Sequence, residues 1–277
     1  MKKKKKGLAI GNSDFKEIIQ ENGYYVDKTK FIEDLLEDLS KVKLFTRPRR
    51  FGKTLNLSML KYFFDVRNAE ENRKLFDNLY ISKSEYMENQ GQNPVILISL
   101  RNAEAENWED SFFNTKNLVK SLYKQFQYIK EKLDEFDLED FLSIVKDKDN
   151  ADWENSLKNL SRYLYEYYGK KVVVLIDEYD QPIIDSYVKG YYDKAISFFK
   201  SFYGLVLKDN EYLEMGVMTG ILRVAKENIF SGLNNLEVHT ILDSEFTEYF
   251  GVMENEVENS LEYYGLEQNI EKVRKWY

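Results

Sequence analysis

Five short runs of apolar residues recur along the chain without alternating polar positions, at 42–45, 95–100, 172–176, 215–218 and 238–242. Mainly apolar runs of this length, without regular alternation, are typical of strands that are covered on both faces. Longer segments separate the runs, and apolar residues recur in them at helical spacing. This alternation predicts a mainly parallel five-stranded sheet flanked by helices, in a three-layer α/β sandwich with right-handed crossovers. Ligands of such sheets bind at the carboxyl ends of the strands.

Two helical stripes stand out between the runs, at 118, 122, 126 and 129 and at 157, 160, 164 and 167. We interpret both as core faces, because an amphipathic helix ordinarily buries one face. From 243 to 277 the pattern is helical and acidic, with no further clear strand. The sequence therefore predicts one large domain over 1–242, followed over 243–277 by a small helical lid or the start of another region. Neither proline nor a Gly/Ser tract marks this boundary.

Composition narrows the class of protein. The 277 residues, of which 43% are hydrophobic, are enough to bury one full core. The chain has no cysteine, which excludes a disulfide framework and a cysteine-based metal site and agrees with a cytoplasmic location. No apolar stretch reaches the roughly 18 residues of a membrane span, so we expect no membrane insertion. The net charge of −8 argues against broad adhesion to nucleic acid but leaves room for a local basic patch.

Residues 47–54 read RPRRFGKT and partly match the phosphate-binding pattern G-x-x-x-x-G-K-[ST]. The Gly-Lys-Thr end matches, whereas Arg47 stands where the first glycine is expected. The apolar run 42–45 leads into this segment and a predicted helix over 55–64 leads out, which is the required order of strand, loop and helix. On this segment alone, a basic turn that caps a surface helix remains an alternative.

A helix that begins near Gly52 directs its free N–H groups and the positive end of its dipole toward a phosphate. Arg49 and Arg50 add positive charge to the loop. Lysine at position 53 is expected to reach the terminal phosphates, and the hydroxyl at position 54 to bind Mg²⁺. The predicted phosphate-binding residues are Arg49, Arg50, Phe51, Gly52, Lys53, Thr54 and Leu55.

The apolar run 172–176 ends in Asp177 and Glu178, about 120 residues after the loop. An acid at the carboxyl end of a central strand faces the same sheet edge as the phosphate loop. We therefore predict that Asp177 holds Mg²⁺ together with Thr54. Glu178 is expected to act as general base toward the attacking water.

A rival hypothesis assigns Asp177, Glu178 and Asp180 to the metal cluster of a nuclease. It lacks a neighbouring strand that ends in a further acid and a lysine, and it leaves the phosphate loop unexplained. We predict instead that Asp180 is a turn acid ahead of Gln181-Pro182. His239 is the sole histidine of the chain, and we predict a structural position for it on the last strand, since a lone ligand does not make a metal site.

Several stretches carry a more specific pattern: GNSDFKEI, YYVDKTKFIEDLL, FTRPRRFGKTLNLSMLKYFF, VVVLIDEYDQPI and TGILRVAKENIFSGLNNLEVHTIL. Together they resemble the AAA-ATPase-like family that is commonly joined to a C-terminal nuclease-like domain of the PD-(D/E)XK type. The resemblance covers nearly the whole chain. The phosphate loop of that family characteristically reads R-P-R-R-F-G-K-[ST], so the arginine at position 47 is a trait of the family.

The resemblance implies an ATP-binding fold of the additional-strand type. It also implies that Thr219, at the end of the run 215–218, senses the terminal phosphate. Arg223 is a further candidate for a phosphate contact, although an arginine after a strand is more often part of a surface ion pair. By similarity, segments 10–15 and 25–29 border the base of the nucleotide, while packing and helix capping explain them as well.

Family members usually continue through an Asp-Gly-Tyr turn into the nuclease-like domain, whereas this sequence stops at position 277. We therefore expect either a fragment or a shortened form, without nuclease activity of its own. The sequence leaves the oligomeric state open.

The leading functional prediction is Mg²⁺-dependent binding and hydrolysis of ATP. It gives catalytic roles to Lys53, Thr219 and Glu178 and metal binding to Thr54 and Asp177. One alternative is a switch that binds ATP without hydrolysing it and regulates an attached effector. Another is a nucleic-acid-associated binding module, which rests only on the loop arginines and the lysine tail at 2–6.

Overall fold

The computed structural model describes residues 5–208, 210–223 and 235–275. Most of the lysine tail and positions 224–234 of the last family-like stretch lie outside these residues. A five-stranded sheet forms the centre, and all its neighbouring strands pair in parallel in the order β4-β5-β6-β3-β7. The strands are β3 (Val42–Thr46), β4 (Val95–Ser99), β5 (Val172–Asp177), β6 (Leu213–Gly220) and β7 (Leu236–His239). The parallel sheet predicted from the apolar runs is confirmed.

The main topological feature of the sheet is the position of β6. β6 lies between β3, which leads into the phosphate loop, and β5, which ends in Asp177. This inserted strand is the feature of the additional-strand type. Every residue of β3 and β5 is buried, as expected for central strands covered on both faces.

The last strand differs from its predicted range of 238–242. It begins at Leu236 and ends at His239, because the carboxylate of Asp243 accepts hydrogen bonds from the backbone N–H and the hydroxyl of Thr240 and closes a turn there. His239 is 3% exposed and its ring stacks on Phe45 at 5.1 Å between ring centroids. Burial lowers the pKa of His239 below its ordinary value.

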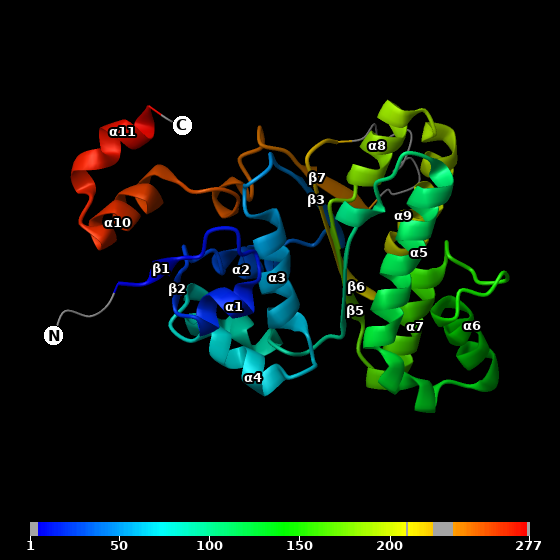
Figure 1. Ribbon diagram of the computed structural model, residues 1–277. Helices are drawn as coiled ribbons and strands as arrows, with labels where there is room; N and C mark the ends of the chain where they lie inside the picture. Colours follow the sequence, from blue (N-terminus) through cyan, green and yellow to red (C-terminus); the bar gives the residue numbers. More distant parts are fainter. Residues whose placement is uncertain (1–4, 209, 224–234, 276–277) are drawn as a thin grey trace.

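Helices cover both faces of the sheet (Figure 1). One layer packs on the sheet face that carries Phe45, and the other packs on the face that carries Val42 and Leu44. The first layer contains α1 (Phe15–Gln20), α2 (Lys30–Glu37), α3 (Lys53–Phe64) and α4 (Ala69–Arg73). The second contains α5 (Trp108–Gln125), α6 (Glu135–Val145), α7 (Ser156–Tyr168), α8 (Gln181–Lys189) and α9 (Tyr192–Leu207).

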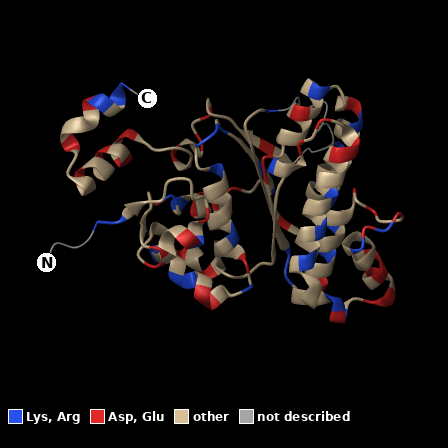
Figure 2. Ribbon diagram, in the orientation of Figure 1, with Lys and Arg blue, Asp and Glu red and all other residues tan. Residues whose placement is uncertain are grey.

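Both predicted helical stripes belong to the core of the second layer. The first stripe runs past the end of α5, since Phe126 is the C-cap of α5 and Ile129 lies in a 3-10 turn, yet both side chains are buried. Basic and acidic side chains are interspersed along the helices of both layers (Figure 2). Within the described ranges, no helix combines the length and the apolarity that crossing a bilayer requires.

Short elements complete the fold. A parallel pair, β1 (Gly7–Leu8) and β2 (Gly23–Tyr24), contacts the C-terminal helices through Tyr24, whose ring lies 5.0 Å from that of Tyr263. These helices are α10 (Glu254–Tyr264) and α11 (Ile270–Arg274), and neither contains a buried residue. The 3-10 turns are η1 (Lys74–Phe76), η2 (Tyr80–Lys83), η3 (Glu85–Asn89), η4 (Arg101–Ala103), η5 (Gln127–Lys132), η6 (Thr247–Tyr249) and η7 (Glu267–Asn269).

The segment between β7 and α10 belongs to the first-layer core rather than to the exposed helices. Phe246, Tyr249 and Phe250 are buried there, and their rings pack around Phe31 and Phe45. The domain boundary at 242/243 remains a prediction.

We expect Gly220→Ala to destabilise the fold. A Cβ at position 220 would lie 2.6 Å from Cε1 of the fully buried Tyr179 ring, and relief requires a shift in a packed core. The free energy of unfolding in urea should fall by about 1–3 kcal/mol. Gly204→Ala is the matched control, since a Cβ in that helix meets no atom within 4 Å and should stabilise α9 by up to about 1 kcal/mol. Equal stabilities of the two variants would contradict this packing argument.

Candidate nucleotide site

The phosphate loop (residues 47–54) leaves β3 and turns directly into α3. The N–H of Arg47 donates to the carbonyl of Gly220 at 3.0 Å, which extends the β3–β6 ladder by one residue. The chain then reverses through two left-handed residues, Arg50 with φ 70° and Gly52 with φ 75°. Glycine adopts this conformation without steric cost, and Gly52 is the N-cap of α3. The free N–H groups at the start of α3 therefore face the carboxyl edge of the sheet.

Arg47 stands where the first glycine of the pattern is expected, and its side chain is buried against other protein groups. Its side chain is 1% exposed, and Nη1 donates to the carbonyls of Thr46 at 3.0 Å and His239 at 2.8 Å. The guanidinium lies 4.9 Å from the centre of the Phe250 ring, and burial lowers the pKa of Arg47. The arginine thus ties the loop to β7 and to the segment before α10.

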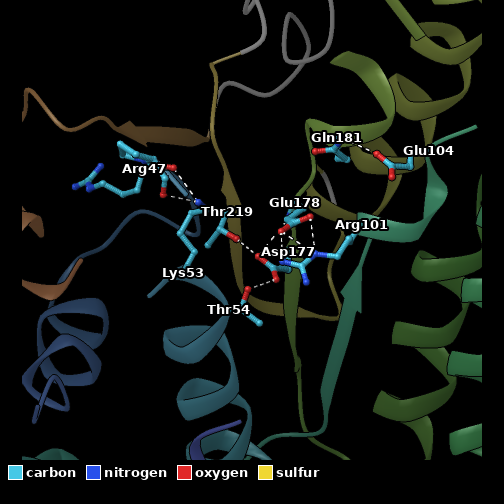
Figure 3. A network of polar contacts seen from close by, with 10 residues as sticks. Arg47, Lys53, Thr54, Arg101, Glu104, Asp177, Glu178, Gln181 and Thr219 are labelled. Carbon is cyan, nitrogen blue, oxygen red and sulfur yellow. Dashed lines mark hydrogen bonds and ion pairs between the residues drawn. The ribbon is translucent and has the colours of Figure 1, made fainter. Parts of the chain in front are cut away.

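Lys53 begins α3 and folds back over its own loop. Its Nζ donates to the carbonyl of Arg47 at 2.8 Å and to that of Pro48 at 2.9 Å (Figure 3). The residue is 7% exposed, and burial lowers the pKa of its ammonium group, while Asp177 and Asp180 oppose this shift. The ammonium of Lys53 therefore lies against the backbone of the loop that the sequence predicts to bind phosphate.

Two hydroxyls converge on Asp177 at the end of β5. Thr54 Oγ1 donates to Oδ2 at 2.7 Å, and Thr219 Oγ1 donates to Oδ1 at 2.5 Å (Figure 3). The three residues come from α3, β5 and β6, and the carboxylate is 3% exposed. The structure therefore brings together three side chains that are separated by 42 and 123 positions in the sequence.

Glu178 follows Asp177 and points toward β4. It has a left-handed backbone, with φ 52°, and its carboxylate accepts a hydrogen bond from Nη2 of Arg101 at 2.9 Å. This pair raises the pKa of Arg101. Sequence reasoning missed Arg101, although its place just after the run 95–100 is a signal that it lies on the same sheet edge.

Asp180 stands apart from this cluster. It is 1% exposed, and its Oδ2 accepts hydrogen bonds from the backbone N–H groups of Ile221 and Leu222 at 2.8 and 2.7 Å. Burial raises the pKa of Asp180 despite these hydrogen bonds. These contacts of Asp180 hold the turn after β6. Arg223, the other candidate for a phosphate contact, is exposed at the end of this turn and directly precedes residues outside the described ranges.

The remaining predicted loop residues differ in exposure. Arg49 and Arg50 are exposed, whereas Phe51 and Leu55 are half-buried. The carbonyl of Phe51 accepts a hydrogen bond from the N–H of Gly251 at 3.0 Å. On the β4 side, a cavity of about 280 Å³ lies beside Asp177 and is lined by this residue, Thr54, Ser99, Arg101, Leu118 and Leu122, among others. A small polar group can therefore approach Asp177 from this side.

A known protein family matches most of this sequence. Residues 9–230 match the family described as "Predicted AAA-ATPase". The chain is also 28% identical, over 279 aligned residues, to an "uncharacterized protein in vnfD 5′region" of Azotobacter chroococcum mcd 1. That alignment covers 99% of this chain and 48% of the relative, so the chain spans about half the relative's length. No solved structure matches it. Because the family match spans most of the chain, the protein belongs to the family of predicted AAA-ATPases.

Proposed function

We propose that the chain binds ATP with Mg²⁺ and hydrolyses it to ADP and phosphate. The observation that carries this proposal is the convergence of Thr54 and Thr219 on one carboxylate, that of Asp177, beside the start of α3. A hydroxyl from the loop helix and an acid at the end of a strand are the groups that hold Mg²⁺ in P-loop nucleotide sites, and the hydroxyl from the inserted strand lies beside them. The family to which the chain belongs supports nucleotide binding.

The donor set fits Mg²⁺, which prefers hard oxygen ligands. Thr54 and Asp177 would hold the ion, because their oxygens already lie 2.7 Å apart on two different elements. When bound, Mg²⁺ neutralises negative charge on the phosphates.

The residues of the chain take the remaining roles. Lys53 would exchange its two loop carbonyls for phosphate oxygens, a favourable exchange since an ammonium binds an anion more strongly than a neutral carbonyl. The N–H groups at the start of α3 would bind the same phosphates. Glu178 would take a proton from the attacking water as the bond between the terminal phosphorus and ADP breaks. Thr219 would orient that water through its hydroxyl.

A second candidate function is a switch that binds ATP with little turnover. The observation that favours it is the ion pair between Glu178 and Arg101, which occupies the carboxylate needed as general base. Because the Arg101 side chain is 70% exposed, the pair is weak and can open. Turnover would then depend on how often Glu178 is released.

The other functional assignments extend the same proposal. The relative's additional length leaves room for an attached effector, for which we propose the nuclease-like domain of longer family members. A reducing cytoplasm suits a chain without cysteine. The loop arginines are proposed to serve nucleotide before nucleic acid, and DNA affinity that survives saturating ATP would reverse that order.

The direct test is ATP titration and phosphate release by the wild-type chain, with MgCl₂ and with excess EDTA. We expect heat of binding with Mg²⁺ and steady phosphate release that EDTA abolishes. Tight ATP binding without phosphate release would select the switch. Failure to bind ATP under either condition would overturn both candidates.

A further inference from the structure

A second cluster of ionisable side chains lies on the β7 side of the sheet, away from Asp177. Among the described residues, Asp38, Glu237 and His239 each offer one ligand atom, and these atoms lie within 4.8 Å of one another. Asp38 is the C-cap of α2, while the other two alternate along β7 and therefore share one face of that strand. Since β6 and β3 separate β5 from β7, this cluster is roughly 15 Å from the end of β5.

A single hydroxyl lies between the two carboxylates of the cluster. Ser40 Oγ lies 2.8 Å from Asp38 Oδ1 and 2.6 Å from Glu237 Oε2. A hydroxyl carries one proton, so it can donate to only one of these two carboxylates at a time. Asp38 Oδ1 also accepts the backbone N–H of Ser40 at 2.7 Å and lies 3.4 Å from Lys43 Nζ, so the hydroxyl is free to donate to Glu237. These contacts hold the two carboxylates close together.

His239 supplies the independent observation. Its side chain is 4% exposed, and its buried Nε2 has no hydrogen-bond partner. This nitrogen lies 3.8 Å from Glu237 Oε2, too far for a hydrogen bond and suitable for a shared ion. In a tetrahedral site with ligand bonds of about 2.0–2.2 Å, two ligand atoms lie about 3.3–3.6 Å apart. Side-chain rotations that shift the ligand atoms by about 1 Å would bring the three atoms to this spacing. The stacking of the imidazole on Phe45 holds the ring in this orientation.

Charge balance leaves room for a dication. Lys43 is the ammonium next to the cluster, with Nζ 3.4 Å from Asp38 Oδ1 and 2.5 Å from the carbonyl of Ser40. Three carboxylates surround it and the imidazole, since Glu245 Oε2 also lies 4.0 Å from Nδ1 of His239. Arg47 is a second cation nearby, since its Nη1 donates to the backbone carbonyl of His239 at 2.8 Å, and the carboxylate of Asp243 also acts on His239. Four carboxylates against two cations leave a net negative charge around the imidazole.

We propose that Asp38, Glu237 and His239 form a binding site for a divalent transition-metal ion of the Zn²⁺ class. One imidazole and two carboxylates match the nitrogen and oxygen ligands of such ions, and the nitrogen disfavours Mg²⁺ and Ca²⁺. The site is distinct from the proposed Mg²⁺ site and does not depend on ATP binding. The sequence did not predict this site, because a single histidine does not make a metal site. The fold brings Asp38 and Glu237 next to it.

The test uses the single histidine of the chain as the reporter, because a ¹⁵N-labelled protein then shows one imidazole spin system. ZnCl₂ is titrated at about pH 7.5, above the ordinary histidine pKa of about 6.5. Excess MgCl₂ is present and nucleotide is omitted, so that Mg²⁺ competes with Zn²⁺ for the proposed Mg²⁺ site at Thr54 and Asp177. We expect the Nε2 resonance to move on addition of one equivalent of Zn²⁺, with a matching binding step in calorimetry. An unchanged imidazole spectrum would overturn the proposal.

Substitutions of the ligand residues distinguish a site with three ligands from binding of Zn²⁺ by the histidine alone. Glu237→Gln removes a half-exposed carboxylate and should weaken Zn²⁺ binding about tenfold or more, the scale on which even outer-shell partners act. His239→Phe keeps a ring against Phe45 and should abolish the step. Glu214→Gln, an exposed acid on β6, is the matched control and should bind as the wild type does. Equal Zn²⁺ affinity of Glu237→Gln, Asp38→Asn and wild type would refute the three-residue site.

Discussion

Glu178→Gln is expected to lower the rate of phosphate release by about 10²–10⁴-fold while ATP affinity stays close to that of the wild type. The amide keeps the size of the side chain but cannot take a proton from water. Binding should persist because Glu178 contacts Arg101 in this structure rather than Lys53 or Thr54. The measurement is single-turnover release of phosphate, paired with calorimetric titration of ATP.

Glu104→Gln is the matched control for this variant. Glu104 is an exposed carboxylate near the same sheet edge, where it accepts a hydrogen bond from Gln181 at 2.9 Å, outside the group around Asp177. It should release phosphate at the wild-type rate. Ordinary turnover in Glu178→Gln would remove Glu178 from the proposed mechanism, and equal losses in both variants would indicate a general disturbance of this edge.

Lys53→Ala is expected to weaken ATP binding by about ten- to a hundredfold, which corresponds to the 1.5–3 kcal/mol of a hydrogen bond to a charged group. The substitution removes the ammonium that reaches the loop carbonyls of Arg47 and Pro48. Pro48 is exposed, so water can replace the lysine at its carbonyl, whereas Arg47 is buried and its carbonyl loses a partner. We therefore expect a loss of about 1–3 kcal/mol in the free energy of unfolding, with the fold retained. Calorimetric titration of ATP with Mg²⁺, together with a thermal melt, measures both effects.

Lys61→Ala provides the comparison on the same helix. Lys61 lies two turns further along α3, where its Nζ is 4.7 Å from the centre of the Tyr62 ring, and it should have no part in nucleotide binding. Its ATP affinity should match that of the wild type. If Lys53→Ala bound ATP as tightly as Lys61→Ala, the assignment of residues 47–54 as a phosphate loop would be wrong.

The loop also connects the proposed site to the C-terminal helices. Arg47 lies against Phe250, and the side-chain amide of Asn56 on α3 donates to the carbonyl of Tyr249 at 2.9 Å. Lys28 Nζ then joins this segment to α10, through the carbonyl of Glu248 at 2.6 Å and the carboxylate of Glu256 at 2.5 Å. The phosphate loop is therefore connected to α10 by a short series of direct contacts, through which a change in loop conformation can shift this helix.

The local sequence pattern predicted the main strands of this protein and its phosphate loop. The apolar runs predicted the strands because a strand buried on both faces needs apolar residues at consecutive positions. The order of strand, Gly-Lys-Thr and helix predicted the phosphate loop, since the glycine conformation and the helix N-terminus act within a few residues. Asp177 followed from its place at the end of the most apolar run.

Tertiary structure decided which of these elements are neighbours. Periodicity shows which face of a strand is buried but not which strand lies beside it, and the order β5-β6-β3-β7 is what places Thr219 on Asp177. The same order sets the burial of Arg47 against β7 and gathers Asp38, Glu237 and His239, whose sequence spacing carries no metal-binding pattern. Packing of distant segments fixes such contacts, so the residues that form them could be recognised only in the folded chain.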